Sequence, residues 1–142
     1  MAEAQQTIDV DVSPEAFYAV IADVERYPEF LPAIENVRVL RREGDVVEAE
    51  FTLHLITHID YTLQLTGTPP TGLIWTLLEG GLVANTGSWT LEPLPDGGTR
   101  AHYAVRVEVG MFVPGAILTR LVGRELPATL QAFKARAEGA SA

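Results

Sequence analysis

Apolar and polar side chains alternate along most of the chain. Between residues 34 and 109 the odd positions keep most of the large apolar side chains, as in the segment 47–53, where Val47, Phe51 and Leu53 alternate with Glu48, Glu50 and Thr52. A period of two is typical of a strand with one buried face. Turn-forming residues at 42–45, 68–72, 80–81 and 95–98 divide this region, and residues 7–12 have the same alternation. We therefore expect an antiparallel sheet of about seven strands with one apolar face.

Two short helices are predicted after the first strand. Ser13 followed by Pro14 is typical of a helix start, because the serine hydroxyl accepts from a free backbone N–H and proline is tolerated in the first turn. Phe17 and Ile21 would then share one helical face. Two prolines within residues 24–32 allow only a second short helix or a turn.

Helical spacing returns between Pro114 and about Ala137. The apolar positions of this segment are Leu118, Leu121, Val122, Leu126, Leu130 and Phe133. Pro127 cannot donate to the carbonyl of Gly123, so we expect a bend there unless two helices meet at this point. A curved sheet with one apolar face needs a cover. We predict one α+β domain over residues 1–142, a helix-grip fold in which the sheet wraps round a long C-terminal helix.

Four segments of the chain carry a resemblance to a known family. They are VSPEAF at 12–17 and DVERYPEFLP at 23–32, which are the most specific, and GSWTLEPL at 87–94 and FKARAE at 133–138. These segments resemble those of the START-like, or Bet v 1-like (SRPBCC), superfamily. The resemblance implies a scaffold shared by coenzyme Q-binding proteins, polyketide aromatase/cyclases and lipid carriers. The YPxFLP turn favours the coenzyme Q-binding branch, although Ala33 and Ile34 stand where that branch often has an aromatic residue and a cysteine.

Composition narrows the choice of partners and compartment. The net charge is −9, from 19 acidic and 10 basic residues, which disfavours nucleic acid and anionic lipid headgroups as partners. The chain has no cysteine, no apolar run of about 18 residues and no signal-peptide pattern at its N-terminus. We expect a soluble, cytoplasmic protein without a membrane-spanning segment.

The three histidines lie at even, polar positions, namely His54, His58 and His102. On one straight strand His54 and His58 would be about 13 Å apart, too far to share a metal ion. The chain also lacks the sequence order of a Ser/His/Asp catalytic triad, a phosphate-binding glycine loop and an HExxH helix. We therefore predict no metal, no cofactor and no catalytic residue of these types.

The apolar face of the central strands contains no Asp, Glu, His, Lys or Arg at the positions assigned to it. Its polar groups are the hydroxyls of Tyr61 and Tyr103 and the indole N–H groups of Trp75 and Trp89. Each either finds a partner in an ordinary core or orients the oxygen atoms of a ligand. The expected apolar wall of such a site consists of Phe51, Leu53, Leu63, Leu91, Val105 and Leu121.

The leading hypothesis is binding or carriage of a hydrophobic small molecule, such as a lipid, an isoprenoid quinone or a polyketide-like compound. The alternative is a polyketide aromatase/cyclase, for which ring closure would use general acid/base groups. By sequence, Arg106 is the nearest charged candidate for such a group, but its even position directs its side chain away from the apolar face. A third possibility is a protein-interaction role like that of ribosome-associated relatives.

Overall fold

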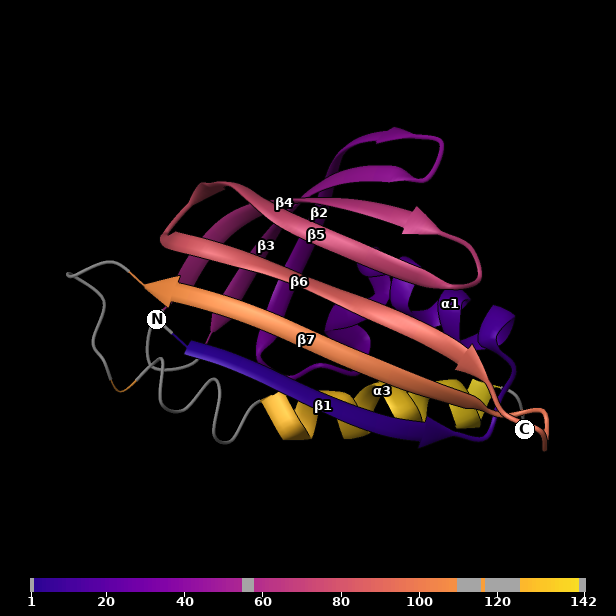
Figure 1. Ribbon diagram of the computed structural model, residues 1–142. Coiled ribbons are helices and arrows are strands. Elements are labelled where there is room, and N and C mark those ends of the chain that lie inside the picture. Colours follow the sequence, from indigo (N-terminus) through magenta and orange to yellow (C-terminus); the bar gives the residue numbers. More distant parts are fainter. Residues whose placement is uncertain (1, 55–57, 110–115, 117–125, 141–142) are drawn as a thin grey trace.

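Antiparallel strands make up most of the computed structural model, which describes residues 2–54, 58–109, 116 and 126–140 (Figure 1). The elements follow in the order β1 (Ala2–Val10), α1 (Pro14–Ala22), the 3₁₀ helix η1 (Val24–Glu29), β2 (Ile34–Glu43), β3 (Val46–His54), β4 (His58–Thr68), β5 (Gly72–Gly80), β6 (Leu82–Pro93), β7 (Thr99–Val109) and α3 (Leu126–Ala140). This order confirms the predicted α+β helix-grip fold.

The seven strands form one sheet in the order β1-β7-β6-β5-β4-β3-β2, with every neighbouring pair antiparallel. Strands β1 and β2 therefore form its two edges. Figure 1 shows the sheet curving, with α1 and α3 on the same side of it. The inner face of the sheet and these helices enclose the core.

The predicted alternation is present in the strands. In β3, Val47, Ala49, Phe51 and Leu53 are buried, whereas the residues between them are half-buried. The large apolar side chains at the even positions Ile74 and Leu78 are exposed on the opposite face. One exception is Thr62, which is buried although its position is even.

Helix α1 begins where the capping pattern predicts. The hydroxyl of Ser13 accepts a hydrogen bond from the backbone N–H of Ala16 at 3.2 Å, and Pro14 is the first helical residue. Phe17 and Ile21 on its inner face are fully buried. The cap satisfies a backbone donor that has no partner within the helix, and the apolar face fixes the helix on the sheet.

The 3₁₀ helix η1 is held by Tyr27. Its hydroxyl donates to the carbonyl oxygen of Ile21, and its backbone carbonyl accepts from the N–H of Leu31 at 2.8 Å. The Tyr27 ring packs edge-on against Phe133 of α3, with centroids 5.2 Å apart. Because Tyr27 contacts both α1 and α3, it places the turn that follows η1 beside the core.

Helix α3 is described from Leu126 onward, so Pro127 lies in the first turn of its described part. The predicted bend depends on the carbonyl of Gly123, which lies outside the described residues together with Leu118, Leu121 and Val122. The bend therefore stays a prediction. No helix among the described residues is long and apolar enough to span a bilayer.

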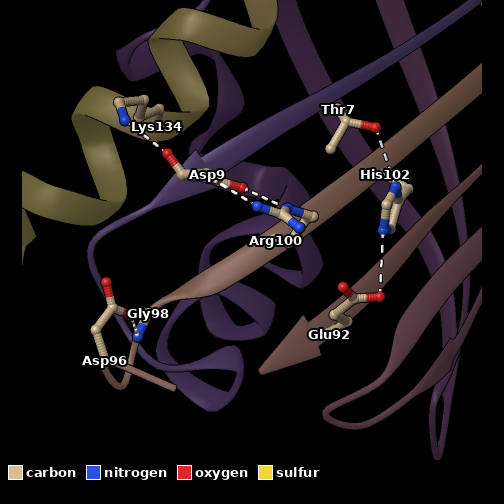
Figure 2. A network of polar contacts seen from close by, with 8 residues as sticks. All are labelled: Thr7, Asp9, Glu92, Asp96, Gly98, Arg100, His102 and Lys134. Atoms are coloured by element: carbon tan, nitrogen blue, oxygen red, sulfur yellow. Dashed lines mark hydrogen bonds and ion pairs between the residues drawn. The ribbon is translucent and has the colours of Figure 1, made fainter. Parts of the chain in front are cut away.

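Polar contacts join α3 to the end of β1 (Figure 2). The ammonium group of Lys134 donates to the backbone carbonyl of Asp9 at 2.6 Å. The Asp9 carboxylate accepts two hydrogen bonds from the Arg100 guanidinium, at 2.9 and 3.2 Å. Asp9 thus connects α3, β1 and β7 through its backbone and its side chain.

Two further contacts lie along α3. The carboxylate of Glu138 accepts from the backbone N–H of Asp11 at 3.0 Å, and Arg136 donates to Glu29 of η1 at 2.6 Å. These hydrogen bonds lower the pKa of Glu138 and the pKa of Glu29. The hydrogen bond from Arg100 lowers the pKa of Asp9 in the same way.

Acid is expected to weaken the polar contacts that Asp9, Glu29 and Glu138 make around α3. A carboxyl group whose pKa is lower in the folded chain stabilises the fold above its unfolded pKa, near 4, and loses that contribution as the pH falls through the lowered folded value. The thermal midpoint should fall between about pH 5 and pH 3. Asp9→Asn combined with Glu29→Gln and Glu138→Gln should flatten this dependence, whereas Glu79→Gln on β5 should not. Equal slopes for all three proteins, measured by circular dichroism, would contradict the assignment.

Candidate ligand cavity

A cavity of about 220 Å³ lies between the inner face of the sheet, the turn after η1, and α3. Eight of the ten residues expected at a ligand site line it, namely Phe51, Leu53, Tyr61, Leu63, Trp75, Trp89, Tyr103 and Val105. Leu91 is buried but is not among the lining residues. Leu121 lies outside the described residues.

Parts of the lining were not predicted as site residues. Tyr27 of η1, the first residue of β2, Ile34, and the turn between them, with Leu31, Pro32 and Ala33, belong to this part of the lining. Helix α3 supplies Leu126, Ala128, Thr129, Ala132 and Phe133. Strand alternation carries no information on a turn. The apolar spacing of residues 126–133 did identify the helical face that covers the sheet.

Asn85 is a buried polar residue of the cavity lining that was not predicted. Its side-chain oxygen accepts a hydrogen bond from the indole N–H of Trp75 at 3.0 Å, and the residue is 8% exposed. Asn85 occupies an odd position in β6, the parity that was assigned to the inner face. The same alternation would therefore have identified it had β6 been extended back from Trp89 to residue 85.

The hydroxyls of Tyr61 and Tyr103 have no hydrogen-bond partner among the residues that the structure describes. Every fully enclosed side-chain polar atom in that part of the chain does have one. The two hydroxyls are therefore accessible from the cavity. Hydroxyl donors that face an apolar space are the kind of polar group that orients a ligand.

Burial keeps these tyrosines neutral. Desolvation raises the pKa of Tyr61 well above its ordinary value, and desolvation together with the neighbouring Tyr61 raises the pKa of Tyr103. Both hydroxyls therefore keep their protons at physiological pH. They can donate hydrogen bonds to carbonyl or other acceptor oxygens, but they do not act as phenolate bases.

Aromatic rings fix the position of Tyr61 and Tyr103. The Tyr61 ring stacks on Phe51 with centroids 5.6 Å apart. The Tyr103 ring lies against Trp89 at 4.8 Å and Trp75 at 5.6 Å. Because these neighbours are buried or half-buried, the hydroxyls have defined positions before any ligand enters.

The placement of two histidines corrects an expectation. His54 ends β3 and His58 begins β4, and the two residues pair across the strands with ring centroids 4.0 Å apart. The distance of about 13 Å predicted from one straight strand is wrong, because His54 and His58 lie on two adjacent antiparallel strands and not on one. All three histidines lie outside the cavity lining, as their parity predicts.

The sheet and helices form a START-like helix-grip fold around this cavity. The chain belongs to the polyketide cyclase/dehydrase and lipid transport family, whose sequence profile matches residues 10–134. The START superfamily protein from Mycobacterium smegmatis has the same fold, with a TM-score of 0.83 at 21% identity over 96% of this chain and 97% of that one.

Two relatives of this chain carry names that indicate different functions. The granaticin polyketide synthase bifunctional cyclase/dehydratase of Streptomyces violaceoruber is 28% identical over 88% of this chain, which spans only 42% of that protein. The persistence and stress-resistance toxin PasT of Escherichia coli is 26% identical over 97% of this chain and 88% of its own length. Since one is named as an enzyme and the other as a toxin, the choice of function rests on the cavity.

Proposed function

We propose that the cavity binds a compact hydrophobic molecule that carries acceptor oxygens, and that the protein stores or carries this molecule without changing it. The observation that carries the proposal is the pair of neutral hydroxyls of Tyr61 and Tyr103 within an apolar wall, neither of which has a hydrogen-bond partner among the described residues. An aromatic quinone or a polyketide-like ring system matches this chemistry. The apolar surface supplies affinity, and the two hydroxyls supply orientation.

The lining favours binding over catalysis. Among the described residues of the wall there is no Asp, Glu, His, Lys or Arg. Aldol ring closure needs a group that removes a proton from carbon, and such general bases are most often His, Asp, Glu or Lys. The raised pKa of Tyr61 and Tyr103 keeps both hydroxyls protonated, so neither is available as a phenolate base.

Cavity size favours a compact ligand. A cavity of about 150 Å³ in another protein holds one benzene molecule. At about 220 Å³ this cavity has room for roughly one or two fused rings. A long isoprenoid chain would extend beyond this volume, so we place only a ring or headgroup inside it.

Aromatase/cyclase activity is the second candidate. The granaticin relative is named a cyclase/dehydratase, and neutral tyrosine hydroxyls can polarise the ketones of a poly-ketone substrate. The carrier function and the cyclase function predict different fates for the bound compound. A cyclase would convert a poly-β-ketone thioester to an aromatic product detectable by mass spectrometry, whereas a carrier would release the compound unchanged.

The test compares 1,4-naphthoquinone with naphthalene by isothermal titration calorimetry. Both are bicyclic, but only the quinone has acceptor oxygens. The wild-type protein should bind the quinone more tightly by about fivefold to tenfold, the effect of roughly one net hydrogen bond. Tyr61→Phe with Tyr103→Phe should remove this preference and leave the affinity for naphthalene nearly unchanged.

Tyr18→Phe is the matched control. Tyr18 lies on α1, outside the cavity lining, so its replacement should leave both affinities unchanged. If the double variant keeps the preference for quinone, the tyrosines do not orient the ligand. If neither compound binds the wild-type protein, the proposed cavity site is wrong.

A further inference from the structure

Three side chains meet on the outer face of the sheet, where β2 begins, β3 ends and β4 begins. They are Glu35, His54 and His58, all exposed, and each offers one ligand atom within 4.8 Å of the other two. The Nε2 atom of His58 lies 2.9 Å from a carboxylate oxygen of Glu35. The imidazole rings of His54 and His58 are nearly parallel, at an angle of 10°.

A β-bulge places Glu35 in this group. Ile34 pairs with Leu53 and Asn36 pairs with Thr52, so Glu35 is an extra residue in β2. Bulges redirect side chains, and here two exposed residues, Glu35 and Asn36, lie between the half-buried Ile34 and Val37. In a regular strand only one residue would separate two inward positions. The extra residue is the one whose carboxylate reaches His58.

The donor set selects a class of ion. Two imidazole nitrogens and one carboxylate oxygen are ligands that Zn²⁺ and neighbouring divalent transition metals prefer. Ca²⁺ and Mg²⁺ prefer oxygen ligands alone. Neither ring nitrogen of His54 has a hydrogen-bond partner among the residues that the structure describes, so a nitrogen of this ring is free to coordinate.

The geometry requires only small movements. Ligand atoms about 2.0–2.2 Å from a tetrahedral Zn²⁺ are roughly 3.3 Å apart. The three atoms are already within 4.8 Å, and their side chains are exposed. Rotation of the two imidazole rings out of their stack would bring them to the coordination distance without a change in the backbone.

From this geometry we infer that Glu35, His54 and His58 form a binding site for a divalent transition-metal ion such as Zn²⁺, with water completing the coordination. The site is separate from the cavity and goes beyond the proposed ligand function. The negative net charge of −9 favours the approach of a cation. The ion would join three strands at one end of the sheet.

A bound ion would also act on the cavity wall. Ile34 and Leu53, the sequence neighbours of Glu35 and His54, pair with each other and line the cavity. Coordination on the outer face would therefore restrict the strands that form the inner wall. The expected role of the ion is structural, because the site is on the face of the sheet opposite to the cavity.

The test uses the untagged full chain, stripped with a chelator and titrated with ZnCl₂ by calorimetry at pH 7.5. One Zn²⁺ per chain is expected. Glu35→Gln, His54→Gln and His58→Gln should each weaken binding by about tenfold or more, because each removes one of three protein ligands. His102→Gln is the matched control, since His102 lies on β7 beside Thr7 and Glu92.

Nuclear magnetic resonance provides a second readout that does not depend on the variants. The chain has three histidines, and Zn²⁺ should shift the imidazole signals of His54 and His58 but not those of His102. Zn²⁺ should also raise the thermal midpoint of the wild-type protein, and at the same Zn²⁺ concentration the increase should be smaller in His54→Gln. No binding below about 100 μM Zn²⁺, about −5.5 kcal/mol, would overturn the inference. Equal losses in the cluster variants and in His102→Gln would do the same.

Discussion

Replacing Phe133 with alanine is expected to lower the free energy of unfolding by about 3–5 kcal/mol, the range for large aromatic residues in a core. Phe133 is 3% exposed. Its ring packs edge-on against Tyr27 at 5.2 Å, Phe30 at 5.3 Å and Trp89 at 5.4 Å. One side chain of α3 therefore contacts η1, the turn after it and the sheet. Its loss should leave an empty space in the core and loosen the helix that covers the candidate ligand cavity.

Urea unfolding followed by circular dichroism measures this effect. Phe133→Leu is the matched control, because it keeps most of the apolar volume and should cost clearly less than the alanine variant. The alanine variant should also admit a larger ligand, since the Phe133 ring lines the cavity. If Phe133→Ala lowers the free energy of unfolding by less than about 1 kcal/mol, the position of α3 does not depend on the aromatic contacts of Phe133.

Replacing Gly87 with alanine should destabilise the fold by about 1–3 kcal/mol, the usual cost of overpacking, and should displace Trp75. A methyl group at residue 87 would lie 2.1 Å from Cζ2 of Trp75 and 2.7 Å from the backbone carbonyl oxygen of Ala104. The indole ring lies over Gly87, its partner on the adjacent strand. Because Trp75 donates to Asn85, its movement would break the polar contact in the cavity wall.

The measurement combines urea unfolding with the indole N–H signals of the two tryptophans. The signal of Trp75 should shift more than that of Trp89, and naphthoquinone affinity should fall. Gly139→Ala is the control, because a methyl group there has no atom within 4 Å. It should leave the cavity unchanged and either stabilise α3 or be neutral. Unchanged stability and an unmoved Trp75 signal in Gly87→Ala would contradict the predicted packing.

Local rules were sufficient for most of the fold. The alternation in β3 predicted which side chains are buried, because a strand directs successive residues to opposite faces. Ser13 and Pro14 predicted the start of α1, because a capping hydroxyl and a first-turn proline act within a few residues. Neither prediction requires knowledge of distant parts of the chain.

The candidate site was harder to predict because it depends on position along a strand and on chain reversals. Parity placed Leu91 and Val105 on the same face, yet only Val105 lines the cavity. Leu91 lies beyond Trp89 toward the end of β6, and alternation carries no information on distance along a strand. His54 and His58 were separated in the prediction because residues 55–57 contain no glycine, proline, asparagine or aspartate.

The edge position of β2 has a consequence for the behaviour of the protein at high concentration. An edge strand presents unpaired backbone groups that can pair with another chain and begin aggregation. In β2 the exposed residues include Arg38, Arg41 and Arg42, and the strand has register shifts near Glu35 and near Leu40. Charged side chains and an irregular backbone make a poor template for a further strand. The bulge that brings Glu35 toward the histidines therefore also protects this edge against intermolecular sheet formation.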